Sequence, residues 1–294
     1  MSFISQDTGY VFLVIFGLVM FFVTKFFVRK SSLKDFLVAD RKIGWLKGSF
    51  SIAASWLWAP ALFVSVQVAY QQGLAGLFWF TVPNIFALAM FASLAPKIRE
   101  KMPEGFTLPQ YIKHRLGSRV HKIYLFPYVF YQIMAVTVQL FAGGSLVSLL
   151  TGIPLIVVMP ILAIIALAYT LISGLEASVI TDFLQLSLIF VVGAVILPMV
   201  WAKAGSFAYM NLRGIADIAS VFDPGVAFSF GIVTSIGLIA GALSDQQYWQ
   251  RAFAIKKDHL KKAFIFGALL FGIVPIALST LGFIAANPGF NIIL

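Results

Sequence analysis

Residues 47–71 read KGSFSIAASWLWAPALFVSVQVAYQ, and this stretch has no charged residue after its first lysine. About 20 apolar residues in a helix are enough to cross the hydrocarbon core of a bilayer. Pro60 stands in the middle of the stretch, where a proline removes one backbone donor and clashes with the carbonyl four residues earlier. We therefore predict a membrane-spanning helix whose hydrogen-bond ladder opens around residues 53–56.

The composition of the whole chain indicates an all-α polytopic membrane protein. Of the 294 residues, 61% are hydrophobic and only 11% are charged. Soluble domains are about 45–50% apolar and about 25% charged, so this chain has too little polar surface for a water-soluble globule. The apolar runs predict one transmembrane domain over residues 1–294, with eight helices. We place these helices at residues 9–28, 47–71, 75–96, 123–149, 153–172, 178–201, 226–249 and 263–286.

The positive charges fall on one side of this arrangement. The net charge is +10, and all but two of the 21 lysines and arginines lie in or beside the connections after the first, third and seventh helices. The two exceptions are Lys203 and Arg213. Because basic loops are retained in the cytoplasm, we expect a multi-pass protein of the cell (plasma or inner) membrane with its N-terminus outside. Topology and contact with membrane lipid explain these charges, and no nucleic-acid partner is expected.

The residues that catalysis needs are scarce. The chain has no cysteine, and the three histidines lie beside lysines and arginines instead of inside apolar runs. Membrane-embedded metal, redox or hydrolytic chemistry needs facing histidine, cysteine or carboxylate groups at depth. We therefore expect no enzyme, no catalytic residue, no resident metal and no organic cofactor.

Polar side chains inside the predicted spans are candidates for function. Gln132 and Gln139 stand seven residues apart, on one face of the fourth helix, and this face should look into the bundle because an unpaired amide is costly in hydrocarbon. A hydrogen bond between helices explains either glutamine alone better than a ligand does. Asp182 near the start of the sixth helix is likewise better explained as a cap than as an ion ligand, on the residues alone.

Aromatic residues follow the seventh predicted helix. Tyr248 and Trp249 precede Arg251 in the sequence ALSDQQYWQRAFAIKK. Tyrosine and tryptophan are enriched at the level of the lipid headgroups, and arginine is retained just inside the cytoplasm. We therefore expect this segment to anchor the helix at the membrane surface.

Six segments, taken together and in this order, resemble the sodium:solute symporter family. They are DFLVADRKIGWLKGSFSIAAS, YQQGLAG, FTLPQYIKHRLG, QLFAGG, SGLEASVITDFLQ and SDQQYWQRAFAIKK, which run from about Asp35 to Gly267. The segments WLWAPALF and DQQYWQRA are most similar to the urea-transporter branch of this family. The resemblance implies a LeuT-type five-plus-five inverted repeat preceded by one extra helix. The first repeat would cover residues 47–201 and a partial second repeat residues 226–286, with the last three core helices missing from a truncated chain.

The resemblance also implies a path for a coupling ion. In the family a sodium ion binds where the first core helix unwinds, and the matching backbone carbonyls belong to Ala53 and Trp56. These residues lie where the proline argument places the break. The aspartate on the family's sodium exit route matches Asp182, with Thr181 and Gln185 in the same motif. The expected coupling ion is Na⁺.

The solute is expected near the midplane, beside the second, fourth and seventh helices. The tyrosine that gates sugar-transporting members of the family falls on Gly241, so a sugar is disfavoured. The candidate solute-binding residues are Ser55, Trp58, Gln67, Gln132, Gln139 and Gly241.

These expectations lead to one hypothesis and two alternatives. The hypothesis is a sodium-coupled symporter of a small polar organic solute that works by alternating access, which truncation could inactivate. One alternative is a non-transporting membrane scaffold or fragment. The other is a proton-coupled transporter of a urea-like solute, since Glu176, Asp182 and Asp245 all lie toward the predicted inner side.

Overall fold

The computed structural model describes residues 3–27, 32–204 and 221–286, and these residues form helices joined by short connections. Six helical stretches in these ranges are long and apolar enough to cross a membrane. The second half of the second predicted helix and the whole of the third fall in the long stretch Ala59–Lys101, and the fifth corresponds to a shorter apolar stretch, Leu155–Leu171. The expected all-α polytopic membrane architecture is confirmed. The division into repeats at residues 47–201 and 226–286 stays a prediction, and Arg213 lies outside the described residues.

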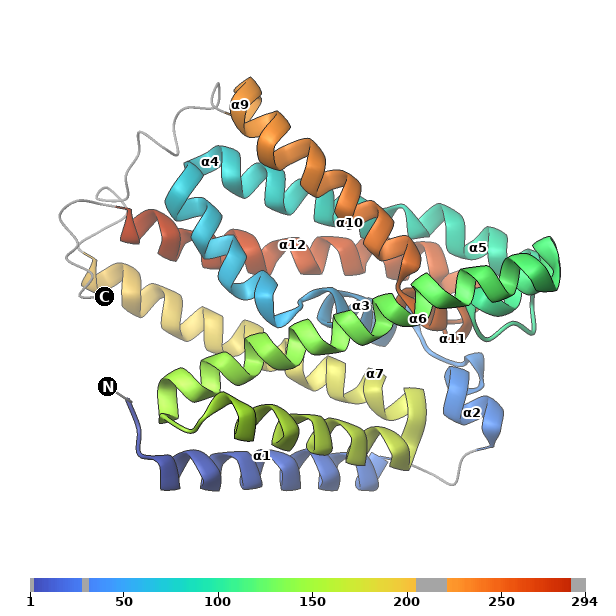
Figure 1. Ribbon diagram of the computed structural model, residues 1–294, viewed down its shortest axis with the longest axis horizontal. Coiled ribbons are helices and arrows are strands. Elements are labelled where there is room, and N and C mark those ends of the chain that lie inside the picture. Colours follow the sequence, from blue (N-terminus) through green and yellow to red (C-terminus); the bar gives the residue numbers. More distant parts are fainter. Residues whose placement is uncertain (1–2, 28–31, 205–220, 287–294) are drawn as a thin grey trace.

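Figure 1 shows the helices aligned mostly along the long axis of the molecule, with α12 near the centre. In chain order they are α1 (Gln6–Phe27), α2 (Leu33–Val38), η1 (Ala39–Arg41), α3 (Trp45–Trp56), α4 (Ala59–Ala89), α5 (Phe91–Lys101), α6 (Leu108–Thr151), α7 (Leu155–Lys203), α9 (Pro224–Val226), η4 (Ala227–Ile232), α10 (Val233–Ser244), α11 (Gln246–Ala254), η5 (Lys257–His259) and α12 (Leu260–Ala285).

Two of the long helices turn back at a glycine. Gly73 in α4 has a φ of 58° and Gly174 in α7 has a φ of 61°, in the left-handed region that favours glycine. Figure 1 shows both helices changing direction. These glycines fall where the sequence predicts the connections between the second and third helices and between the fifth and sixth. The helix boundaries there agree with the prediction to within a few residues.

The predicted interruption before Pro60 is present, and it lies slightly later than expected. Helix α3 continues to Trp56, Leu57 and Trp58 are non-helical, and α4 begins at Ala59 with Pro60 in its first turn. The first turn is the part of a helix that tolerates proline, because its amides have no partner inside the helix. Pro60 therefore starts the second half of the broken helix, and the break falls at residues 57–58 instead of 53–56.

The expected membrane anchor after the seventh span is wrong. Helix α10 ends at Ser244, an extended Asp245 follows, and α11 then forms a separate helix. Tyr248 and Trp249 are 0% and 3% exposed. Their rings pack 5.2 Å from the ring of Trp56 and 4.8 Å from that of Phe91, respectively. The aromatic residues of α11 are therefore part of the protein core and not a headgroup belt.

The largest core lies where α3, α5, α11 and α12 meet. Phe91, Phe253, Phe264 and Phe271 are fully buried there. Because lipid tails are as apolar as these rings, close packing holds such helices together more than the hydrophobic effect does. Main-chain bonds add to this packing, since the amide of Ile43 donates to the carbonyl of Ala254 and the carbonyl of Ile43 accepts from Lys256, at 3.3 and 3.0 Å.

Candidate functional site

A cavity of about 300 Å³ lies beside the break between α3 and α4. Helices α6 and α10 supply its other walls. Its lining includes Trp56, Trp58, Phe80, Asn84, Tyr131 and Gly241. Three of these residues, Trp56, Trp58 and Gly241, are sequence-predicted site residues. The cavity is therefore the candidate site for a solute.

The backbone at the break leaves carbonyl groups without helical partners. The amide of Leu57 donates to the carbonyl of Ala53 at 3.0 Å and so caps α3. The carbonyls of Ala54, Ser55 and Trp56 have no amide one turn further along the same helix, as at every helix end. Of the two carbonyls predicted to bind sodium, that of Trp56 lies at the open end of α3, and that of Ala53 already accepts one hydrogen bond.

Two glutamines of α6 attach to the ends of the broken helices. The side-chain oxygen of Gln139 accepts the amide of Ala59, the first residue of α4, at 2.7 Å. The side-chain nitrogen of Gln132 donates to the carbonyl of Ser244, the last residue of α10, at 3.1 Å. Both amides thus satisfy backbone groups that a helix end would otherwise leave unpaired. They position the walls of the cavity.

The indole N–H of Trp56 bonds to a side-chain oxygen, whereas that of Trp58 faces the hydroxyl of Tyr248. Trp56 donates its ring N–H to the side-chain oxygen of Asn84 at 2.6 Å, and Asn84 donates to the carbonyl of Phe80. The ring N–H of Trp58 and the hydroxyl of Tyr248 are both buried and lie next to each other, and within the described residues neither forms a well-aligned hydrogen bond to any other group. Buried donors without a partner are rare in native proteins, and each one requires an explanation.

Tyr131 occupies the space opposite Gly241. A side-chain carbon added to Gly241 would lie 3.2 Å from the hydroxyl oxygen of Tyr131, which is closer than an ordinary van der Waals contact. The absence of a side chain at position 241 thus makes room for a tyrosine from another helix. The cavity keeps an aromatic hydroxyl group at this wall, supplied by α6 instead of α10.

The other solute candidates lie apart from the cavity lining. The hydroxyl of Ser55 donates to the carbonyl of Ser51 at 2.7 Å, one turn earlier in α3. Gln67 is exposed on the outer surface of α4. The structure therefore places Trp58 and Gly241 in the cavity lining and bonds Gln132 and Gln139 to adjoining helix ends. It leaves Ser55 and Gln67 outside this group.

Asp182 is held in a buried network with two other residues. Its carboxylate lies 2.7 Å from the guanidinium of Arg251 and accepts a hydrogen bond of 2.5 Å from the hydroxyl of Ser51. Arg251 also donates to the Ser51 hydroxyl at 2.7 Å. The arginine side chain is 4% exposed and the aspartate 14%. Arg251, expected at the membrane surface, is instead buried between α3, α7 and α11.

The two neighbours of Asp182 in the predicted ion path differ in position. Thr181 is buried and donates its hydroxyl to the carbonyl of Ser178 at 2.9 Å. Gln185 is exposed on the surface of α7, with its amide 3.9 Å from the sulfur of Met20 on α1. Thr181 thus lies with Asp182 inside the protein, and Gln185 faces the first helix.

Asp245 is a second buried carboxylate, directly after the span Pro224–Ser244. It is 0% exposed, and its two oxygens accept hydrogen bonds of 2.9 and 3.2 Å from the backbone and side chain of Gln247. Within the described residues it forms no ion pair, because Arg251 is engaged by Asp182. Burial raises the pKa of the Asp245 carboxyl group above its usual value. Such a group takes up a proton more readily than an exposed aspartate.

Three residues of the site were not predicted from the sequence. Asn84 is a polar residue in the middle of the apolar third span, and this position in the sequence alone indicates a functional residue. Tyr131 directly precedes Gln132 and shares the inner side of α6. Ser51 had no such signal, since its role depends on partners 131 and 200 residues away.

The family model described as "Sodium:solute symporter family" matches residues 36–291. The chain is 25% identical to "Probable urea active transporter 1" of Schizosaccharomyces pombe, over 96% of this chain and 46% of that protein. It is 22% identical to "Urea-proton symporter DUR3" of Oryza sativa subsp. japonica, over 94% and 44%, and 27% identical to "High-affinity choline transporter 1" of Caenorhabditis elegans, over 86% and 44%. The chain spans less than half the length of these relatives.

Proposed function

The chain belongs to the sodium:solute symporter family, and on this premise we propose that it serves in the coupled transport of a small polar solute by alternating access. The observation that carries the proposal is the cavity at the break between α3 and α4, with the buried ring N–H of Trp58 in its lining. Interrupted helices near the middle of a membrane are where secondary transporters bind solutes and ions. The relatives bear the names of transporters and not of enzymes.

The chemistry of the cavity supports a flat, neutral solute with a carbonyl oxygen, such as urea. The ring N–H of Trp58, which lines the cavity, can donate to such an oxygen in place of the Tyr248 hydroxyl. The aromatic rings of Trp56, Phe80 and Tyr131 offer surfaces on which a planar molecule can stack. Two relatives that match nearly the whole chain are named as urea transporters.

Sodium is our first candidate for the coupling ion. Carbonyl oxygens are suitable ligands for a hard cation, and the C-terminal end of a helix carries partial negative charge. The carbonyls of Ala53 and Trp56 lie at this end of α3. We expect an ion bound there to leave past Thr181 and Asp182, whose carboxylate would exchange Arg251 for the passing ion.

A proton is the second candidate, and Asp245 is the observation that favours it. This carboxylate is buried, lacks an ion pair among the described residues and follows Gly241 of the cavity by one helical turn. The charged and titratable groups around it are Arg251 and Tyr248 from α11, and Tyr128 and Tyr131 from α6. Asp245 can become neutral by taking up a proton, and a relative is named as a urea-proton symporter.

Uptake of labelled urea into proteoliposomes that contain the purified chain tests the proposal. An inward sodium gradient at equal pH and an acidic exterior without sodium are applied separately. Uptake with sodium alone supports the carbonyl site, whereas uptake with acid alone that is lost in Asp245→Asn supports proton coupling. Equilibrium binding of labelled urea to the same preparation reports the cavity directly. A well-folded preparation with neither binding nor uptake would point to a non-transporting scaffold.

In a cell we expect the protein in the plasma membrane with its N-terminus outside. The charge asymmetry supports this orientation, since the basic connections after the first, third and seventh spans would all face the cytoplasm. The break of α3, the Asp182–Arg251 pair and these connections then follow one another along the path from the cavity to the inside.

A further inference from the structure

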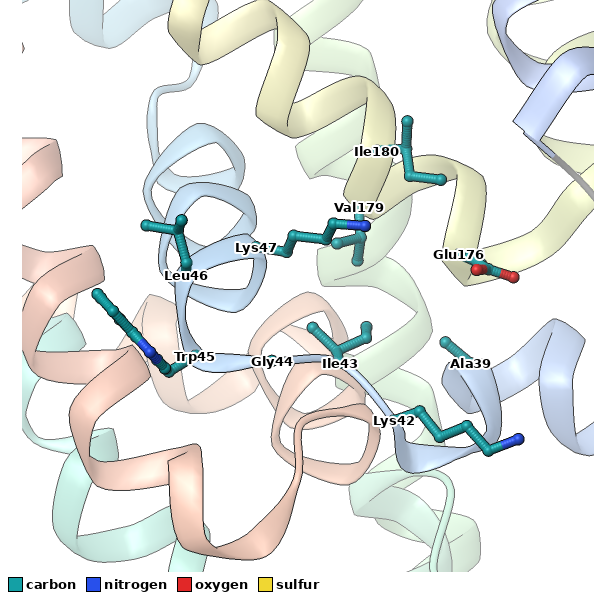
Figure 2. Close-up of a pocket in the computed structure, with 10 residues that line it drawn as sticks. All are labelled: Ala39, Lys42, Ile43, Gly44, Trp45, Leu46, Lys47, Glu176, Val179 and Ile180. Atoms are coloured by element: carbon teal, nitrogen blue, oxygen red, sulfur yellow. The ribbon is translucent and has the colours of Figure 1, made fainter.

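A second cavity lies between the segment that leads into α3 and the part of α7 that follows Gly174. Its volume is about 410 Å³. Figure 2 shows that Ile43, Trp45 and Lys47 line it from one side, and that Glu176, Val179 and Ile180 line it from the other. None of these residues belongs to the solute cavity.

Charges of both signs surround this second cavity, and two of them form no ion pair among the described residues. Lys42 forms an ion pair with Asp40 at 3.2 Å. For Lys47 and Glu176, the described part of the chain provides no ion-pair partner within 4.0 Å. Figure 2 shows Lys47 extending from α3 in the direction of α7, with Glu176 at the other side of the cavity. Because Asp40 neutralises Lys42, Lys47 and Glu176 leave one charge of each sign at the cavity, and these two charges match a ligand that itself carries one positive and one negative group.

The position of the cavity along the helices places it at the edge of the membrane. Trp45 is the first residue of α3, and the apolar span of α7 begins at Gly174. The ammonium of Lys262 lies 3.7 Å from the centre of the Trp45 ring, a cation–π contact between two residue types that are common at headgroup level. Leu46 is 46% exposed beside the cavity and offers an apolar surface.

We propose that this cavity binds the headgroup of phosphatidylethanolamine. Lys47 would bind the phosphate, Glu176 would accept hydrogen bonds from the ammonium group, and an acyl chain would lie along Leu46. An anionic headgroup would leave Glu176 without a partner next to a like charge. A choline headgroup carries a positive charge but no N–H group to donate, so it can use Lys47 and only part of the interaction with Glu176.

Native mass spectrometry of the full chain tests this site by counting retained lipids. The purified protein is exchanged with equal amounts of phosphatidylethanolamine, phosphatidylcholine and phosphatidylglycerol of the same acyl chains. We expect about threefold more retention of the ethanolamine lipid than of the choline lipid, which is the size of a partly exposed charged contact. Glu176→Gln should equalise the two, and Lys47→Gln should lower the retention of both.

Matched controls are Glu100→Gln and Lys34→Gln, which alter exposed residues outside the cavity and should leave the preference unchanged. Equal retention of the ethanolamine and choline lipids by the wild-type chain would overturn the proposal without any variant. A preference that persists in Glu176→Gln, or stronger retention of phosphatidylglycerol, would also overturn it. Thermal unfolding of each variant confirms that it is folded before lipids are counted.

Discussion

The carboxylate of Asp182 on α7 lies 2.7 Å from the guanidinium of Arg251 on α11, and the hydroxyl of Ser51 on α3 bonds to both. Three elements that are far apart in the chain thus meet at one buried contact. A buried ion pair is a poor source of net stability, but removal of one partner leaves the other charge without compensation. The contact therefore favours one arrangement of α3, α7 and α11 over others.

Replacement of Arg251 by Met should destabilise the protein by about 3 kcal/mol, because Asp182 would remain buried and unpaired. Asp182→Asn in addition to Arg251→Met should restore part of the loss, since no charge is then left. Thermal unfolding in detergent measures both effects. Lys257→Met serves as the control, because its side chain is 56% exposed and its ion pair with Glu100 is on the surface. An unchanged midpoint for Arg251→Met would show that the pair is not buried in solution.

Trp58→Phe should weaken urea binding about tenfold, because the substitution keeps an aromatic ring and removes one hydrogen-bond donor worth roughly 1.4 kcal/mol. Its stability should change little, since the ring N–H forms no well-aligned hydrogen bond within the described residues beyond its contact with the Tyr248 hydroxyl. Equilibrium binding and thermal unfolding are compared in parallel. Trp79→Phe is the matched control, whose ring N–H donates to the carbonyl of Val221 away from the cavity. The control should lose stability but keep affinity, and the reverse result would contradict the assignment of Trp58.

Gly241→Ala should reduce solute affinity because the new methyl group would press on the hydroxyl of Tyr131. Gly237 also lines the cavity, but a side-chain carbon there meets no atom within 4 Å. Gly237→Ala should therefore keep its affinity and gain up to about 1 kcal/mol of helix stability. Urea binding by the two variants distinguishes them. Equal losses of affinity would mean that the volume of the cavity matters and the Tyr131 contact does not.

Gly174→Ala should destabilise the protein strongly. The residue has a φ of 61°, and a side-chain carbon would collide with the backbone carbonyl of Phe36 on α2. Both the strained backbone and the displaced helix cost free energy, of which the left-handed conformation alone accounts for about 1 kcal/mol. Gly193→Ala in the same helix is the control, because its added carbon meets nothing within 4 Å. Proteolysis and thermal unfolding should separate the two variants, and similar curves would argue against the contact between α2 and α7.

The predicted orientation can be tested by cysteine labelling, since the chain has no cysteine of its own. A membrane-impermeant maleimide added to intact cells should label Asp7→Cys near the N-terminus. Lys257→Cys should react only after permeabilisation, because the sequence places that connection inside. Labelling of the second variant and not the first in intact cells would reverse the topology.

Much of the fold could be predicted from local signals. Apolar runs predict the spans, and Pro60, Gly73 and Gly174 mark where helices break or turn, because the backbone restrictions of proline and glycine act within a few residues. The break was placed a few residues early, since proline prefers the first turn of the next helix.

Less of the candidate site than of the fold could be predicted from the sequence, because the contacts of the site join segments that are far apart in the chain. The face that Gln132 and Gln139 share predicted that both point inward, but their partners could not be read from one helix. Arg251 stands among exposed basic residues in the sequence and bonds to an aspartate 69 residues away. Tyr248 and Trp249 are residue types that occur both in membrane anchors and in short helices with a buried aromatic face. Only tertiary packing separates these two possibilities.

The hydrogen bonds that Ile43 forms with Ala254 and Lys256 involve peptide groups alone. These bonds require no particular side chain. Substitutions in either segment therefore leave them intact, unless a proline replaces one of the two residues whose amides donate. Proteins with few identical residues can therefore keep the entry to α3 fastened to the exit of α11. Proline at position 43 or 256 would remove one of these hydrogen bonds and would show whether the two segments must move together.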